Sequence, residues 1–215
     1  MRKLDKLTCT HRVNPTKGTP FSRSRKLLQR AGIVRARDLE LVGVSRTELE
    51  KFVERGVIEC WAPGIYALPG WGQCERAELA LAAVRMPAGV ICLLSALRFH
   101  GLTGQNPSEV WMSIEKKVWG PEVAHPPLRF MVRSGAGQTE GVEEHDGWGA
   151  TLRVFSAAKT VADCFKFRNK IGIDVAVEAL QDYRDLHPKR LEAVRRFAKI
   201  NRVSQVIRPY LEGLE

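Results

Sequence analysis

The sequence lacks any apolar run near the roughly 20 residues that span a bilayer. Its longest such run, AGVICLLSALRF at 88–99, is expected to be a buried segment, so no membrane partner is predicted. The first 20 residues contain no stretch of signal-peptide length and no small-residue cleavage pattern, which argues against export. Residues 1–20 are interpreted as a basic, partly disordered leader.

Cysteine and histidine are scarce and widely spaced. The five histidines share no ligand spacing, so neither a metal site nor a cofactor is predicted. The cysteines form no CxxC pair, which argues against a disulfide framework and a zinc cluster. A reducing cytoplasm is the expected compartment. The cysteines are Cys9, Cys60, Cys74, Cys92 and Cys164.

The signatures of common enzymes are also missing. GAGQTEG at 135–141 lacks the Lys-Ser/Thr of a phosphate loop and is interpreted as a hairpin loop. Glu115 opens the EKK of a nuclease half-site, but no Asp precedes it at a useful distance. Ser95 lacks an activating His–Asp pair, so we expect it to bond backbone groups. His100 is interpreted as a helix C-terminal group favoured by the dipole. No catalytic residue is predicted.

Positive charge is abundant and unevenly distributed. Of the net +10, residues 1–72 carry 14 Lys and Arg against 7 Asp and Glu, which gives +7. The remaining 143 residues carry 20 against 17, which gives +3. A small basic domain before a nearly balanced one predicts that the first binds a polyanion. An ordinary basic surface is the alternative on charge alone.

Two short helices are expected first. From Phe21 an apolar stripe at helical spacing runs to Gly32, with Ser22 as the predicted N-cap. The segment RARDLELVG then predicts a second helix of about two turns that ends at Gly43.

A third helix has the clearest boundaries in the sequence. Ser45 and Glu48 have capping-box spacing, and Gly56 stands where a left-handed residue would end the helix. Leu49, Phe52 and Val53 form the inward stripe. The outward set is predicted to be Arg46, Thr47, Glu50, Lys51, Glu54 and Arg55.

After Gly56, the runs VIECW and IYALP are separated by Ala62-Pro63-Gly64, which is typical of a hairpin. Three helices and a hairpin predict a winged helix-turn-helix over 21–72, with the third helix in a major groove and the wing on the adjacent backbone. Glu50 and Glu54 oppose phosphate binding, and protein docking by the winged helix remains an alternative. Trp61 is assigned to DNA or to a neighbouring domain. The predicted DNA-contacting residues are Arg23, Arg25, Lys26, Arg35, Arg37, Ser45, Arg46, Thr47, Lys51, Arg55 and Trp61.

Residues 73–215 predict a second, mixed domain, so the fold class is α+β. Helices are expected over 74–86, 89–102, 157–172, 173–185 and 188–200, followed by a short segment over 204–214, and strands over 109–117, 127–134 and 151–157. From Pro188 to Arg208 seven Lys and Arg face a single Glu192. This basic run is either a solvated face or a second surface for a polyanion or a partner.

The order of three segments resembles the AbiEi family of antitoxins from type IV toxin–antitoxin and abortive-infection systems. They are VERGVIECWAPGIYALPG, LALAAVRMPAGVICLLSALRFHGLT and SAAKTVADCFKFRNKIGIDVAVEALQDY, and the likeness covers roughly residues 21–208. The family implies an N-terminal winged helix that represses its own operon and a C-terminal domain, 73–215, that neutralises a nucleotidyltransferase-like toxin. By position, Ser45 to Gly56 would be the recognition helix and Ile58 to Leu68 the wing.

The resemblance implies a cytoplasmic, non-enzymatic antitoxin and transcriptional autorepressor in phage defence. Its expected partners are inverted repeats in double-stranded promoter DNA and the cognate toxin, met directly or indirectly. Some relatives are kinases that act on their toxin, and this is the alternative function. No kinase glycine loop, catalytic-loop Asp or metal-binding Asp is present in the sequence, which argues against it.

Overall fold

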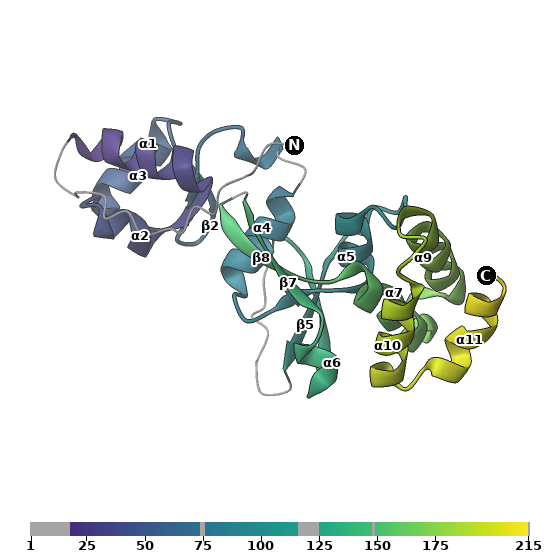
Figure 1. Ribbon diagram of the computed structural model, residues 1–215. Coiled ribbons are helices and arrows are strands. Elements are labelled where there is room, and N and C mark those ends of the chain that lie inside the picture. The colour runs from purple at the N-terminus through teal and green to yellow at the C-terminus, as the bar shows by residue number, and fades with distance from the viewer. Residues whose placement is uncertain (1–17, 74–75, 116–124, 148, 215) are drawn as a thin grey trace. The chain divides into compact units, whose positions relative to one another are not determined.

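The computed structural model describes residues 18–73, 76–115, 125–147 and 149–214, and it is shown as a ribbon in Figure 1. Residues 1–17 of the expected leader lie outside this range. The chain divides into two compact units, Met1–Trp71 and Gly72–Glu215, called here the N-terminal and C-terminal units. No described helix is both long enough and apolar enough to cross a membrane.

The N-terminal unit has the predicted winged-helix order, with one strand more than the sequence indicated. A short strand follows the first helix and pairs antiparallel with the second strand of the hairpin, so the sheet order is β1-β3-β2. The elements are α1 (Pro20–Ala31), β1 (Ile33–Arg35), α2 (Ala36–Leu41), α3 (Arg46–Glu54), β2 (Glu59–Ala62) and β3 (Ile65–Ala67).

One buried leucine from each helix meets in the core of the N-terminal unit. Leu28, Leu39 and Leu49 are at most 1% exposed, and burying a leucine side chain contributes about 1.5–3 kcal/mol. The prediction of Ser22 as N-cap of α1 is wrong: the cap is Thr19, whose hydroxyl accepts from the Ser22 N–H at 3.2 Å. The helix starts earlier because proline fits its first turn, where no N–H is needed.

The C-terminal unit is built on a five-stranded mixed sheet of order β6-β5-β4-β8-β7. Its β5–β6 and β4–β8 pairs are parallel, and its β4–β5 and β7–β8 pairs are antiparallel. The strands are β4 (Val90–Ile91), β5 (Val110–Glu115), β6 (Leu128–Arg133), β7 (Val142–Gly147) and β8 (Ala150–Phe155). The helices are α4 (Ala77–Arg85), α5 (Leu93–His100), α6 (Ala136–Thr139), α7 (Ala157–Lys166), α8 (Arg168–Ile171), α9 (Ile173–Leu186), α10 (Leu191–Asn201) and α11 (Ser204–Glu212).

Helices cover both faces of this sheet, as Figure 1 shows. Because side chains alternate along a strand, Met112 and Ile114 of β5 pack with Met86 and Ala82 beneath α4. On the other face, Trp111 joins the larger core that α5, α7, α9, α10 and α11 share. Every residue of β5 from Val110 to Ile114 is therefore buried.

Two sequence-based assignments in the C-terminal unit are wrong. The segment 89–102 is not one helix: Val90 and Ile91 form β4, and α5 starts only at Leu93. The segment 135–141 is not a hairpin loop, because it joins β6 and β7 at opposite edges of the sheet through α6. Gln138 of α6 is 5% exposed, and its side chain bonds Ser113 of β5. A short apolar run cannot reveal by periodicity alone whether it is strand or helix.

Candidate nucleic-acid interface

The helix α3 begins with the predicted capping box. The Ser45 hydroxyl accepts from the Glu48 N–H at 3.3 Å, and the Glu48 carboxylate accepts from the Ser45 N–H at 2.8 Å. The Glu48 carboxylate also accepts from the Ser45 hydroxyl at 2.8 Å, and the bonds it accepts from the Ser45 N–H and hydroxyl lower the pKa of Glu48 from its ordinary value. The exchange satisfies two N–H groups that a helix start would otherwise leave open, so the first turn of α3 is fixed by its own residues.

The end of α3 is a glycine turn. Gly56 has φ +65°, and its N–H donates to the Val53 carbonyl at 2.9 Å. The next N–H, of Val57, returns to the Phe52 carbonyl at 3.0 Å. This left-handed turn redirects the chain into β2, as the sequence predicted.

The face of α3 opposite the core has the predicted composition. Leu49 and Phe52 are buried. Residues of the outward set are all exposed, and these are Arg46, Thr47, Glu50, Lys51, Glu54 and Arg55. Arg46 lies 3.7 Å from Glu40 of α2, in a pair between exposed side chains that contributes little. The face therefore presents three cations, two carboxylates and one hydroxyl to solvent.

Two of the predicted DNA-contacting arginines have structural contacts instead of open surface positions. The Arg23 Nη2 donates to the Gly43 carbonyl at 2.8 Å, which ties α1 to the turn between α2 and α3. Arg35 is the residue before α2, and its backbone N–H donates to Asp38 Oδ2 at 3.1 Å. Both side chains are half-buried. The three other predicted cations that precede α3, Arg25, Lys26 and Arg37, are exposed.

The wing formed by β2, β3 and their turn carries no positive charge. From Val57 to Gln73 the sequence contains no Lys or Arg. The Gly64 carbonyl at the tip accepts from the Ala36 N–H at 2.8 Å, which anchors the turn to the start of α2. A contact between this wing and a phosphate backbone would have to come from backbone N–H groups or from a neutral side chain such as Tyr66, rather than from charge.

Trp61 is held inside the N-terminal unit. Its ring packs edge-on against Trp71 with centroids 5.4 Å apart, and its Nε1 donates to Glu59 Oε2 at 3.0 Å. The side chain is half-buried. Its assignment to DNA or to a neighbouring domain stays a prediction.

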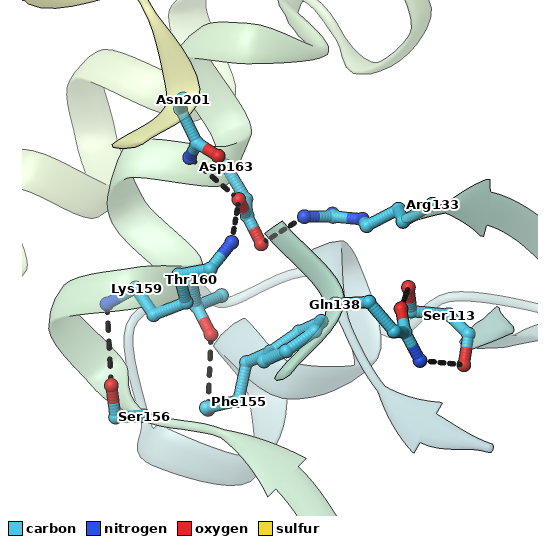
Figure 2. A network of polar contacts seen from close by, with 9 residues as sticks. All are labelled: Ser113, Arg133, Gln138, Phe155, Ser156, Lys159, Thr160, Asp163 and Asn201. Carbon is cyan, nitrogen blue, oxygen red and sulfur yellow. Dashed lines mark hydrogen bonds and ion pairs between the residues drawn. The ribbon is translucent and has the colours of Figure 1, made fainter. Parts of the chain in front are cut away.

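The C-terminal unit holds a buried charge network that the sequence did not indicate, drawn in Figure 2. Lys159 Nζ lies 2.5 Å from Asp163 Oδ1, and Asn201 Nδ2 donates to the same oxygen at 2.7 Å. From β6, Arg133 Nη1 lies 2.6 Å from Asp163 Oδ2. The N–H bonds of Arg133 do not point along this contact, so it is an ion pair rather than a hydrogen bond. The i,i+4 spacing of Lys159 and Asp163, which favours an ion pair on a helix, was the one feature of the sequence that could have indicated the network.

The network contains two cations and one carboxylate. The three side chains are at most 3% exposed, so no substrate reaches them and their arrangement is structural. Burial lowers the pKa of Lys159, while Asp163 acts in the opposite direction. The Arg133 guanidinium lies over the Phe167 ring at 4.7 Å, and Lys159 Nζ lies 4.7 Å from the Phe155 ring. Aromatic faces thus supply part of the stabilisation that a second carboxylate would give.

The residues that resembled enzyme groups also have structural partners. The Ser95 hydroxyl accepts from the Trp111 N–H at 2.9 Å, so the predicted backbone role is confirmed. His100 Nε2 lies 2.8 Å from the Phe155 carbonyl of β8, and burial lowers its pKa. The Lys116 and Lys117 of the EKK motif lie outside the described residues. Within the described ranges no three His, Cys, Asp or Glu side chains converge as metal ligands.

Comparisons with known proteins agree with this architecture. Residues 22–69, which span α1 to β3, match the family model described as a transcriptional regulator, AbiEi antitoxin. Among solved structures, the chain is similar to the RV2827C protein from Mycobacterium tuberculosis, with 14% identity and a TM-score of 0.50. That match covers 86% of this chain and 76% of the other, and at this identity it shows the fold alone. The search of curated proteins gave no match.

Proposed function

We propose that the N-terminal unit binds duplex DNA through α3. The premise is that residues 22–69 match the model of the AbiEi antitoxin family of transcriptional regulators. The observation that supports this is the outward face of α3, where Arg46, Lys51 and Arg55 are exposed on a helix whose two ends are fixed. A rigid helix with exposed arginines is suited to the major groove, where Arg reads guanine.

The remaining phosphate contacts are assigned to three exposed cations of α1 and α2, namely Arg25, Lys26 and Arg37. Arg23 and Arg35 support the helices that carry these contacts, and Ser45 and Thr47 lie at the start of α3. Glu50 and Glu54 lie on the same face and oppose phosphates. They confine α3 to the groove centre, where a carboxylate can accept from a cytosine amino group.

The full proposed function is a cytoplasmic antitoxin that represses its own operon by binding inverted repeats in the promoter. Its C-terminal unit, directly or indirectly, opposes the nucleotidyltransferase-like toxin that the family resemblance implies. We propose that it does so without catalysis, because the sequence contains no kinase glycine loop, catalytic-loop Asp or metal-binding Asp.

The DNA-binding proposal is tested by anisotropy titration of the full chain against its own upstream duplex and a scrambled duplex, at two salt concentrations. We expect preference for the native duplex at both concentrations. The variant Lys51→Ala/Arg55→Ala should lose about 1–3 kcal/mol for each base contact removed, or less with a shallower salt dependence if the contacts are to phosphate.

A matched control is Lys170→Ala/Lys189→Ala, which removes two exposed positive charges from the C-terminal unit. It should bind like the wild type. If both double variants bind the native duplex as tightly as the wild-type chain, α3 is not the recognition helix. If the native and scrambled duplexes bind equally and the affinity falls steeply as salt is added, the positive charge makes only non-specific contacts with phosphates.

The antitoxin part is tested by co-expression with the toxin gene of the same operon, where growth should be restored by the wild-type chain. Purified toxin, incubated with the protein and ATP, should keep its mass in a mass spectrometer. An added phosphate would replace the non-catalytic proposal with the kinase alternative.

A further inference from the structure

The helices α10 and α11 enclose a hollow on the surface of the C-terminal unit. The chain turns between them at Arg202, which has a left-handed backbone with φ 59°. The hollow has a volume of about 150 Å³. Its floor is formed by the buried Ala198, Ile207 and Leu211, and the rest of its lining, which forms the rim, is polar or charged: Arg195, Lys199, Ser204, Gln205 and Arg208. We call this the α10–α11 hollow.

The floor of the α10–α11 hollow suits an apolar group. Ala198, Ile207 and Leu211 belong to the large core of the C-terminal unit, so the floor is fixed by packing. An apolar cavity of roughly 150 Å³ is large enough to hold a benzene ring. One leucine, isoleucine or phenylalanine side chain of a partner therefore fits into it.

The rim of the hollow is positive and its cations can be reached. Arg195 lies 3.7 Å from Glu192, and Arg208 lies 3.6 Å from Glu212, each within its own helix. The Arg208 pair is exposed and contributes little, so an incoming carboxylate can replace Glu212 there, whereas the Arg195 side chain is only 30% exposed. Lys199 is exposed and makes no ion pair within the described part of the chain.

The surroundings of the hollow extend its positive field. Residues 188–208 contain seven Lys and Arg and a single Glu192. A concentration of one sign of charge steers partners of the opposite sign and fixes their orientation. The partner is therefore acidic around its apolar anchor.

We propose that the α10–α11 hollow binds an acidic segment of a partner protein, which places one apolar side chain on the floor and its carboxylates on the rim. Nucleic acid fits less well, because phosphates cannot fill an apolar floor and the described lining has no aromatic ring on which a base stacks. This site is separate from α3, so the inference does not depend on DNA binding.

The inference is tested by selecting a display library of short random peptides against the full chain. We expect enriched peptides to carry Asp or Glu around a single Leu, Ile or Phe. A selected peptide should bind Lys199→Glu/Arg208→Glu about tenfold more weakly or worse, because two attractive contacts become repulsive. Replacing the apolar anchor of the peptide by serine should also remove binding.

The matched control is Arg98→Glu/Lys170→Glu, which makes the same charge change at exposed residues outside both the hollow and the basic run 188–208, and it should bind the peptide nearly as well as the wild type. Circular dichroism of both variants separates a folding defect from loss of this site. Promoter binding by both variants separates a failure of the DNA-binding proposal from loss of this site. The inference would be overturned if no peptides were enriched, or if the enriched peptides lacked acidic residues. It would also be overturned if both variants lost peptide binding equally. The same holds if the hollow variant kept peptide binding and lost only oligonucleotide binding or self-association.

Discussion

The two units of this protein use positive charge in opposite ways. In the N-terminal unit Lys51 and Arg55 stand on the solvent side of a helix whose other side forms the core. In the C-terminal unit Arg133 and Lys159 lie inside, against one carboxylate and two aromatic rings. A count of charges along the sequence treats all four residues alike.

The comparison shows that a cation indicates a binding surface only once its burial is known. The boundaries of α3 come from local signals, a capping box and a glycine, that lie within 12 residues of one another, from Ser45 to Gly56. The buried network joins β6, α7 and α10, and it exists only when those elements pack together. Each unit should therefore respond to a different kind of substitution.

The largest effect is expected from Asp163→Asn. This change leaves Arg133 and Lys159 buried without a counter-charge, and breaking a buried pair in this way costs about 3–5 kcal/mol. We expect the free energy of unfolding of the C-terminal unit to fall by that amount, as measured by urea titration with hydrogen exchange read from α7 peptides. The control Asp185→Asn alters an exposed pair with Arg184 and should change stability by no more than about 0.5 kcal/mol. Equal stability of Asp163→Asn and the wild type would show that the network carries no charge coupling.

A smaller effect is expected from Gly56→Ala. An added Cβ meets no heavy atom within 4 Å, so the loss comes only from the left-handed backbone with φ +65°, about 1–2 kcal/mol. The N-terminal unit should be destabilised by that amount in hydrogen exchange of α3, and Gly56→Asn should lose less because asparagine tolerates this conformation. Gly137→Ala, inside α6 and also without a near neighbour, is the control and should be neutral or slightly stabilising. A loss in Gly137→Ala as large as in Gly56→Ala would argue against backbone strain as the cause.

The smallest effect is expected from Lys159→Met. The variant keeps Arg133 and Asn201 on Asp163, so one cation then faces one carboxylate, and stability should stay within about 1 kcal/mol of the wild type or exceed it.

The pH dependence of this variant tests the ionisation of Lys159. Burial lowers the pKa of Lys159 below 10.5 in the folded chain, so unfolding takes up a proton between the folded pKa and 10.5. Wild-type stability should therefore rise with pH across that interval relative to Lys159→Met. Below the folded pKa both states hold the proton, so the two stability curves should run parallel there. Parallel stability curves of the two proteins up to pH 10.5 would contradict a lowered pKa.

Much of the fold could be predicted where the signals are local. The capping box of α3, the turn at Gly56 and the outward set of six α3 residues are all confirmed, because neighbours in sequence decide them. The strands β1, β4 and β7 were missed: they are short or highly charged, and a strand is stabilised by partners distant in sequence. For the candidate interface, the exposure of α3 was predictable, whereas the structural contacts of Arg23 and Trp61 were not.

The sequence by itself determined the basic first unit, its three helices and hairpin, and the resemblance that its matched segment bears out. Caps, glycines and periodicity act over a few residues, so they can be read directly from the chain. Only the tertiary structure decided that Arg133 and Lys159 are buried while Lys51 and Lys199 are exposed. The physical reason is that burial depends on which surfaces pack together, and residues 30 positions apart, such as Arg133 and Asp163, meet only after the sheet and its helices have assembled.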